Sequence, residues 1–351
     1  MNLERFIQKK PFIIAGPCSA ESEFQLLQIA EEIKDKTDVF RAGIWKPRTN
    51  PNSFEGVGEK GLQWLQNVHH LTGLKTMTEV ATARHVELCL KAEIDMFWIG
   101  ARTTVNPFYV QEIAEALRGV NIPIFIKNPI HPEIALWAGA LERLYNVGIT
   151  KLAAIHRGFF TYESSVFRNE PKWEIPIELK RNYPELPIIC DPSHIAGDSS
   201  FIFELSQIAM DLDMNGLMVE THQSPKDALS DSRQQIKPKE LQEILNNLIL
   251  RKRRFEDNQL NNELNKMRGW IDELDEQIVE LLHSRTDLVM NIADFKLKNN
   301  ITIFQLERWY NILKLRKQQA NEIGIDDKMI TDLFEVIHKY SIITQTKIMK
   351  N

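Results

Sequence analysis

The chain has 351 residues, of which 43% are hydrophobic, and a formal net charge of -5 at pH 7. This length is enough for more than one hydrophobic core, so we expect two domains. Both signs of charge are spread along the sequence, which leaves no basic surface for nucleic acid and no attraction to a membrane. Three unevenly spaced cysteines do not make a disulfide framework and fit a reducing compartment.

Two short segments resemble targeting signals without meeting their requirements. Residues 1–20 join a charged stretch to an apolar one, but the apolar part is too short for a signal peptide and acidic residues follow it. The basic run RKRR at 251–254 is more typical of a solvated helix end or linker than of a targeting or phosphate-binding patch. No apolar run approaches the length of a membrane span. We therefore expect a soluble, cytoplasmic protein.

Between residue 12 and about residue 250, short β-branched or aromatic runs alternate with longer stretches of helical periodicity. Eight such alternations with nearly continuous apolar strands favour parallel pairing and predict a closed (β/α)8 TIM barrel over residues 1–250. An open doubly wound sheet is the alternative. The predicted strands are 12–16, 39–44, 74–80, 96–100, 123–127, 151–157, 187–191 and 216–220.

Four side chains suited to a divalent metal follow predicted strands of this segment. Cys18 follows the first strand and His194 the seventh, whereas Glu220 ends the eighth and Asp231 comes shortly after it. A thiolate, an imidazole and two carboxylates suit Mn, Fe, Co or Zn better than Mg or Ca. Because the loops that follow barrel strands meet at one end, a closed barrel would bring these ligands together.

Six cations occupy the same strand ends. Any one of them alone is more typical of a surface charge or an ion pair, but together they predict a site for two phosphates and a carboxylate, whose oxygens match guanidinium groups. A metal beside them would polarise a carbonyl. These cations are Arg41, Lys46, Arg48, Arg102, Lys127 and Arg157.

The strand-end motifs GPCSAES, WKPRT, GART, KNP, HRG, DPSHIAG, VETH and ALSDS occur in one order from residue 12 to about residue 245. In this order they resemble 3-deoxy-D-arabino-heptulosonate 7-phosphate (DAHP) synthase of the type I-beta class. The resemblance implies condensation of phosphoenolpyruvate with erythrose 4-phosphate, the first step of the shikimate pathway to aromatic amino acids. The competing family is a related synthase that uses arabinose 5-phosphate, which carries a KANRS-like segment where this chain has KPRT.

The resemblance also implies a role for each matching position. Cys18, His194, Glu220 and Asp231 match the metal ligands, with the metal directed toward the aldehyde of erythrose 4-phosphate. The positions that match the phosphoenolpyruvate site are Arg41, Arg102, Lys127 and Arg157. Lys46 matches a residue between the two substrates, and Arg48 and Thr49 match the grip on the erythrose 4-phosphate phosphate group. Glu79 matches a carboxylate near the attacking water, and Ala101 offers a backbone N–H.

The pattern changes after about residue 251. From residue 260 to residue 295, apolar residues follow alternating steps of four and three, which predicts one long helix interrupted in its seam by Arg285. Two further helices are predicted at roughly 305–321 and 327–348. We assign 251–262 to a linker and the start of the long helix, and 263–351 to a small three-helix domain. The long seam needs a partner chain to cover it, so we expect a homodimer or a higher homo-oligomer.

Arg285 needs an explanation because an unpaired buried guanidinium is costly. Lys296 lies eleven residues further on, which returns it to the same helix face at about 16 Å along the axis. The two cations together could hold a small dianion between them. The alternative is an exposed seam or an ion-paired helical bundle.

The segment from Leu264 to Gln345 resembles chorismate mutase of the all-helical AroQ class, which converts chorismate into prephenate. The family's binding positions match Arg268, Arg285, Lys296, Arg308, Ser341 and Gln345. The family's dimer implies that Arg268 reaches the partner's site. Trp309 stands where the family usually has a carboxylate, and Gln305, one turn earlier, offers a replacement contact to the substrate hydroxyl.

These resemblances predict a bifunctional enzyme with small-molecule substrates. The alternative for the helices is a non-catalytic module for dimerisation or effector binding, which Trp309 favours. Because the barrel begins almost at the N-terminus and leaves no room for a preceding sensor domain, we expect prephenate or chorismate to regulate the barrel through the helices. Cys89 and Cys190 are interpreted as packed small hydrophobic residues, and Asp191 as a side chain that orients a neighbour.

Overall fold

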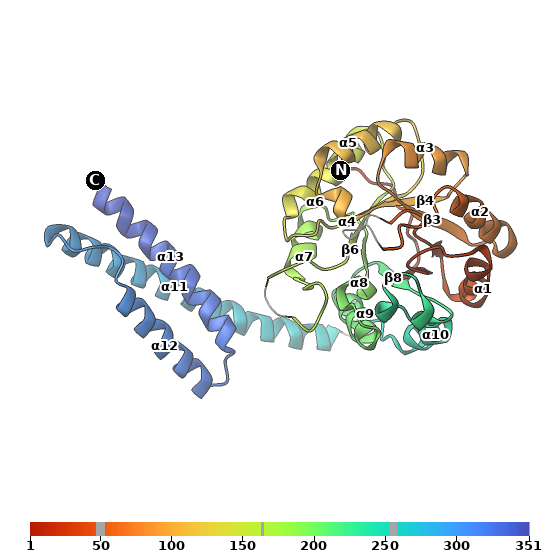
Figure 1. The fold of residues 1–351 in the computed structure, drawn as a ribbon. Helices are drawn as coiled ribbons and strands as arrows, with labels where there is room; N and C mark the ends of the chain where they lie inside the picture. The colour runs from red at the N-terminus through yellow and green to blue at the C-terminus, as the bar shows by residue number, and fades with distance from the viewer. Residues whose placement is uncertain (47–52, 163–164, 253–257, 351) are drawn as a thin grey trace. The chain divides into compact units, whose positions relative to one another are not determined.

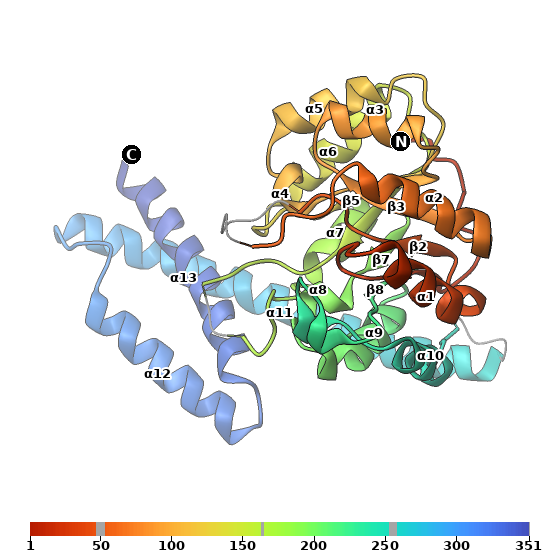
Figure 2. The ribbon, with the colours of Figure 1, turned by 45° about the vertical axis from the view of Figure 1, so that its right-hand side comes forward.

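The computed structural model describes residues 1–46, 53–162, 165–252 and 258–350. The chain divides into two compact units, Met1–Arg253 and Arg254–Asn351. Figures 1 and 2 show a helix-surrounded barrel in the first unit and long helices in the second. Among the described residues, no helix is long and apolar enough to cross a membrane.

The first unit is the predicted TIM barrel. All neighbouring strands are parallel, and β1 pairs with both β2 and β8, so the sheet is closed and the doubly wound alternative is wrong. The register that closes it runs from Phe12 opposite Gly216 to Gly16 opposite Glu220. The strands are β1 Phe12–Gly16, β2 Val39–Arg41, β3 Lys75–Val80, β4 Met96–Ile99, β5 Ile124–Lys127, β6 Leu152–His156, β7 Ile188–Cys190 and β8 Gly216–Glu220.

Two of the strands that are shorter than predicted, β2 and β7, end where the site begins. β2 stops at Arg41, and the next residues turn toward the loop after β1, where Gly43 forms an isolated bridge with Ser19. β7 stops at Cys190, since the Asp191 side chain accepts a hydrogen bond from the His194 backbone and caps the next helix. The polar residues that follow these two strands are therefore outside the sheet hydrogen bonding, at the carboxyl end of the barrel.

Strand side chains divide between two cores. Residues such as Ile14, Trp98 and Phe125 fill the barrel interior, where Phe6 and Ile7 of the N-terminal segment also pack. Outward residues pack against the surrounding helices. These helices are α1 Glu23–Ile33, α2 Lys60–Thr72, α3 Ala83–Lys91, α4 Ala101–Thr104, α5 Pro107–Ala116, α6 Ile134–Asn146, α7 Glu174–Asn182, α8 Pro192–Ala196, α9 Ile202–Asp211 and α10 Pro238–Asn247.

The second unit contains the three predicted helices, α11 Asn258–Lys298, α12 Leu306–Glu322 and α13 Asp327–Lys350. The long helix ends near Asn300, whose left-handed backbone (φ 57°) suits asparagine. Helices α11 and α13 pack side by side. Ile271, Leu274 and Ile278 of the seam are nevertheless 57%, 57% and 53% exposed. One chain therefore leaves much of the α11 seam uncovered.

Candidate functional site

One cavity at the carboxyl ends of the strands gathers most of the predicted barrel residues. Glu79 reaches it from β3, Lys127 from the end of β5 and His194 from α8. Loops after the strands contribute the remainder, as expected for parallel strands whose carboxyl ends meet. The lining residues are Lys46, Glu79, Gly100, Ala101, Arg102, Lys127, Arg157, His194 and Asp231. Arg48 and Thr49 lie outside the described residues.

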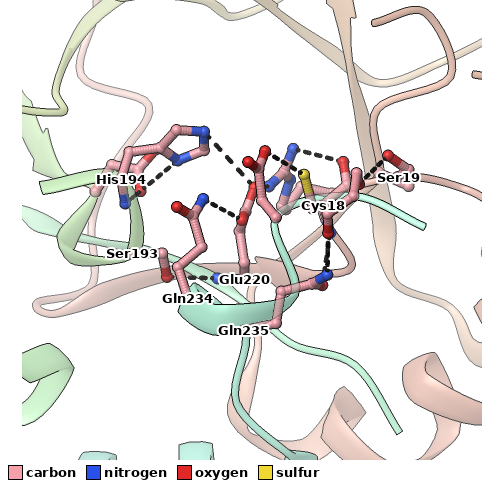
Figure 3. Close-up of polar contacts among 12 residues, drawn as sticks. Cys18, Ser19, Ser193, His194, Glu220, Gln234 and Gln235 are labelled. Carbon is pink, nitrogen blue, oxygen red and sulfur yellow. Dashed lines mark hydrogen bonds and ion pairs between the residues drawn. The ribbon is translucent and has the colours of Figure 1, made fainter. Parts of the chain in front are cut away.

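The four predicted metal ligands lie as two neighbouring pairs. Cys18 Sγ is 3.3 Å from Asp231 Oδ2, and His194 Nε2 is 3.8 Å from Glu220 Oε1 (Figure 3). Lys46 Nζ lies 3.1 Å from the Cys18 sulfur. Among the described residues, no three ligand-type side chains already form a complete metal cluster. Residues separated by more than two hundred positions are thus brought to one place.

The chemistry of these four side chains fits a divalent ion. Burial lowers the pKa of the His194 imidazole, and the nearby Asp191 charge raises it by less. The net lowering leaves the imidazole neutral and able to bind a metal. Burial and the Glu220 charge raise the pKa of the Cys18 thiol to about 11. A thiol of this kind binds metal by releasing its proton. The donor set therefore suits a borderline cation such as Mn, Fe, Co or Zn.

Asp191 holds the His194 ring. Its Oδ1 lies 3.0 Å from His194 Nδ1, which leaves Nε2 directed toward Glu220. Lys127 Nζ donates to Asp191 Oδ2 at 2.7 Å. Burial alone would raise the pKa of Asp191, but His194 and Lys127 outweigh it and hold the pKa well below its ordinary value. The ionised carboxylate orients a potential ligand, as metal-binding histidines require.

Glu220 is fully buried and is held ionised. Arg41 Nη1 donates to its Oε1 at 2.6 Å, and the Arg41 guanidinium also lies 4.7 Å above the Trp98 ring. Burial raises the pKa of Glu220, but His194, Arg41 and Lys46 more than compensate and lower it to about 2. Arg41, predicted to hold phosphoenolpyruvate, thus makes its direct contact with a carboxylate of the metal set.

A cluster of cations occupies the other side of the cavity. Burial, together with nearby Arg168 and Arg102, lowers the pKa of Arg157 to about 10, although Asp191 raises it. The Arg157 side chain donates from Nη1 to Asn169 Oδ1 at 2.8 Å. The cavity is lined by four cations, Lys46, Arg102, Lys127 and Arg157, and such a group favours binding of a multiply charged anion.

The Glu79 carboxylate lies beside the end of β4, between Trp98 and Gly100. Its Oε2 accepts a hydrogen bond from Trp98 Nε1 at 3.0 Å. A Cβ at Gly100 would lie 2.1 Å from Glu79 Oε1, so the glycine that precedes Ala101 and Arg102 permits this carboxylate to enter the cavity. The GART motif therefore has a steric reason for its glycine.

Sequence reasoning missed several polar residues behind the site. Gln235 Oε1 accepts from the Cys18 backbone N–H at 3.0 Å, and Gln234 Nε2 donates to Glu220 Oε2 at 2.7 Å. Arg168 and Asn169 also contact this region. Gln234 and Gln235 carry the one local signal in the sequence, because they adjoin the apolar Ile236 and buried amide side chains need hydrogen-bond partners. Arg168 and Asn169 lie in a long loop with no such signal.

The helical unit gathers part of its predicted site. Arg285 Nη1 donates to Ser341 Oγ at 2.7 Å, and both residues line an otherwise largely apolar cavity between α11 and α13. Gln345, one turn after Ser341, is buried, and its Oε1 has no hydrogen-bond partner among the described residues. Lys296 Nζ donates to Ile303 O at 2.6 Å. A guanidinium and an unsatisfied amide thus point to a polar ligand on this helix pair.

The remaining predicted residues of this unit are exposed in the single chain. Arg268 contacts Asn265 on its own helix, and within the described part of the chain no contact joins Arg268, Arg308 or Gln305 to the Arg285 group. Trp309 stacks on His338 with ring centroids 3.9 Å apart and an interplanar angle of 13°. This aromatic pair occupies the position for which the resemblance implies a carboxylate.

The family model described as DAHP synthetase I family matches residues 7–254. The chain belongs to this family. A second model, Chorismate mutase type II, matches residues 267–346, which are most of the helical unit, so one chain carries a match to each of the two models.

Relatives of the DAHP synthetase barrel include both competing kinds of synthase. Phospho-2-dehydro-3-deoxyheptonate aldolase of Thermotoga maritima is 34% identical over 226 residues, which are 64% of this chain and 64% of that protein. Its crystal structure, titled a DAHP synthase, has a TM-score of 0.61 and 30% identity and covers 67% of each chain. 2-Dehydro-3-deoxyphosphooctonate aldolase of Wolinella succinogenes is 27% identical over 264 residues, which are 68% of this chain and 97% of that protein.

Proposed function

We propose that the barrel condenses phosphoenolpyruvate with erythrose 4-phosphate to give DAHP and phosphate, and that the helical domain converts chorismate into prephenate. The observation that carries the first activity is the cavity whose lining joins four cations to His194 and Asp231, beside which Cys18 and Glu220 lie. Membership of the DAHP synthetase I family and the higher identity to the deoxyheptonate relative support this sugar phosphate over arabinose 5-phosphate.

Cys18, His194, Glu220 and Asp231 would hold a divalent ion, which would polarise the aldehyde carbonyl of erythrose 4-phosphate. Arg102, Lys127 and Arg157 hold the phosphate and carboxylate of phosphoenolpyruvate, with Arg41 behind them on Glu220. Arg48 and Thr49 of KPRT hold the phosphate of the sugar. These contacts fix the two substrates in reacting geometry, which is the main contribution that binding groups make to such a condensation.

Bond making and breaking balance without a redox partner. A carbon–carbon bond forms between C3 of phosphoenolpyruvate and C1 of the aldehyde, whose oxygen becomes a hydroxyl. Water adds to C2, the bond from C2 to the phosphate oxygen breaks, and inorganic phosphate leaves. Lys46 lies between the substrates, the Glu79 carboxylate faces the attacking water, and the Ala101 backbone N–H holds an oxygen of phosphoenolpyruvate.

The mutase assignment rests on the polar group buried between α11 and α13. Arg285, Ser341 and Gln345 bind the dicarboxylate and the ether oxygen of chorismate, together with Lys296 and Arg308. Arg268 reaches the same site from the partner chain, so the mutase works as a homodimer. Gln305 contacts the substrate hydroxyl. The pericyclic rearrangement needs no nucleophile, because binding the compact transition state is sufficient.

A double assay of the full chain tests the bifunctional assignment. We expect wild-type protein to turn over both substrate sets. Arg285→Ala should lower chorismate turnover at least 100-fold, because the substituted cavity lacks the guanidinium that would bind the dianion, and should leave condensation within about two-fold. Arg316→Ala, an exposed change on α12, is the matched control. If a folded wild-type dimer leaves chorismate unchanged, the helices are a dimerisation or effector module.

A further inference from the structure

Arg168 lies in the loop between β6 and α7, and its backbone is fixed against α8. The Arg168 N–H donates to Ala196 O at 3.0 Å, at the carboxyl end of the helix that carries His194. A Cβ at Gly197 would lie 2.4 Å from Arg168 Cβ, so the glycine allows the loop to approach this closely. The loop is therefore anchored beside the barrel site, with the guanidinium free to contact other loops.

The Arg168 guanidinium contacts two residues of the last barrel loop. Its Nη1 lies 2.9 Å from Asp231 Oδ1 and 2.8 Å from Gln234 Oε1. With Oδ1 taken by Arg168, the second oxygen of Asp231 is the one that faces the Cys18 sulfur, at 3.3 Å. Asp231 itself has a left-handed backbone (φ 44°, ψ 42°) at the start of the short helix Ser232–Gln234.

Gln234 connects Arg168 to Glu220 by hydrogen bonds to both residues. The Gln234 side-chain oxygen accepts a hydrogen bond from Arg168, which directs the Gln234 NH2 group toward Glu220. This NH2 group donates to Glu220 Oε2 at 2.7 Å (Figure 3). The amide cannot rotate without losing both hydrogen bonds. One guanidinium thus orients one carboxylate directly and another through an amide.

The next residue of the loop, Asn169, contacts a third member of the set. Its Nδ2 donates to the His194 backbone oxygen at 2.6 Å, and its Oδ1 accepts from Arg157 Nη1 at 2.8 Å. Two adjacent loop residues therefore connect to Asp231, Glu220 and His194, which come from different parts of the barrel rim.

We propose that Arg168 is a positioning residue that presents Asp231 and Glu220 to the metal. This inference rests on the proposed function, in which both carboxylates are metal ligands. Arg168 acts through the ligands and does not contact the reacting atoms. Polar groups behind metal ligands typically change metal affinity by about 10- to 100-fold when removed. Both contacts come from one nitrogen, Nη1, so a lysine whose ammonium group reaches this point would keep part of the arrangement.

Titration of the metal-stripped full chain with Co2+ tests this role, because a cysteine thiolate bound to Co2+ gives a charge-transfer absorption. We expect the band in wild-type protein, an affinity about 10- to 100-fold weaker in Arg168→Ala, and an intermediate value in Arg168→Lys. Arg233→Ala is the matched control, since Arg233 lies in the same loop as Asp231 but pairs with Asp198 and has an 82% exposed side chain. It should bind Co2+ as wild-type protein does.

The condensation assay supplies a second readout. At saturating Mn2+, Arg168→Ala should regain most of its kcat, whereas a general loss of structure would not be corrected by metal. An unchanged Co2+ affinity and spectrum in Arg168→Ala would overturn the role of Arg168 and leave the metal site intact. A wild-type protein without the cysteine band would overturn the proposed metal site itself. If Arg168→Ala does not fold, Arg168→Lys carries the same comparison.

Discussion

Buried ionised groups define the barrel site at the scale of single residues. Glu220 and Asp191 stay ionised because the cations Arg41 and Lys127, respectively, pair with them directly. Burial of an unpaired charge is costly, and each of these carboxylates is compensated by at least one direct ion pair. Removing one partner therefore costs more than the contact itself, since the other charge stays buried.

His156 gives the barrel a dependence on pH. It is fully buried at the end of β6, with its ring centroid 5.1 Å from that of Trp173. Burial, with a contribution from Arg157, lowers the pKa of His156 to about 3 from an ordinary value of 6.5. The unfolded chain takes up this proton below pH 6.5 and the folded barrel does not. The neutral His156 therefore stabilises the fold fully above pH 6.5, and this contribution is lost as the pH falls toward 3.

We expect His156→Phe to reduce this pH dependence. Between pH 7 and pH 5 the wild-type free energy of unfolding should fall by about 2 kcal/mol more than that of the variant, from about 1.4 kcal/mol per pH unit below the unfolded pKa. Urea titrations followed by circular dichroism at both pH values measure the difference. Parallel pH profiles for the two proteins would show that His156 does not titrate on unfolding.

Site residues were predictable where they lie at the carboxyl end of a strand or within two residues of it. Cys18, Lys127 and Glu220 have this relation, because a parallel barrel places all such ends together. Arg168 and Gln234 do not, since their positions depend on the three-dimensional course of long loops. The direct pairing of Arg41 with Glu220 was also not predictable, because a sequence does not show which cation neutralises which carboxylate.

At the scale of elements, the helix α8 shows how local structure places a ligand. This short helix begins after Asp191, whose carboxylate caps the His194 backbone N–H and also holds its ring. The periodicity of the sequence predicts neither the helix nor the cap, because five residues are too few for a helical pattern. The eight strands and the three long helices, in contrast, carry enough repeats to be predicted.

The seam of α11 is exposed along most of its length in one chain. Ile271, Leu274 and Ile278 are more than half exposed, as are Leu288 and Phe295 further along, whereas Arg285 faces the cavity toward α13. An exposed apolar stripe of this length is typical of an interface, and we propose that a second copy covers it.

Polar substitution in the exposed seam should therefore separate the dimer. We expect Leu274→Asp combined with Ile278→Asp to raise the dimer dissociation constant at least 100-fold, because each change occurs twice in a symmetric interface. Chorismate turnover should fall with it, since Arg268 of the partner is lost. Sedimentation velocity measures the change, with Glu280→Ala on the same helix as the control. Dimers that persist in the double variant would place the interface elsewhere.

At the scale of the whole molecule, one chain carries a match to the DAHP synthetase I family and a match to the chorismate mutase type II model. We propose that the helical domain also regulates the barrel by binding prephenate or chorismate, since these are the product and the substrate of the second proposed activity and either would be a natural signal to the first. Saturating prephenate should lower the condensation rate several-fold, and Arg285→Ala should remove this effect. Coupled phosphate release measures both. An unchanged rate in wild-type protein would contradict regulation through the helices.

The central claim is metal-dependent condensation with erythrose 4-phosphate at the barrel site. The most direct measurement supplies the full chain with phosphoenolpyruvate and either erythrose 4-phosphate or arabinose 5-phosphate, after chelation and again after Mn2+ is restored. We expect one phosphate per seven-carbon sugar acid formed, with erythrose 4-phosphate strongly preferred, and activity only when metal is present. Equal or faster reaction with arabinose 5-phosphate, or full activity in the chelated protein, would contradict the account.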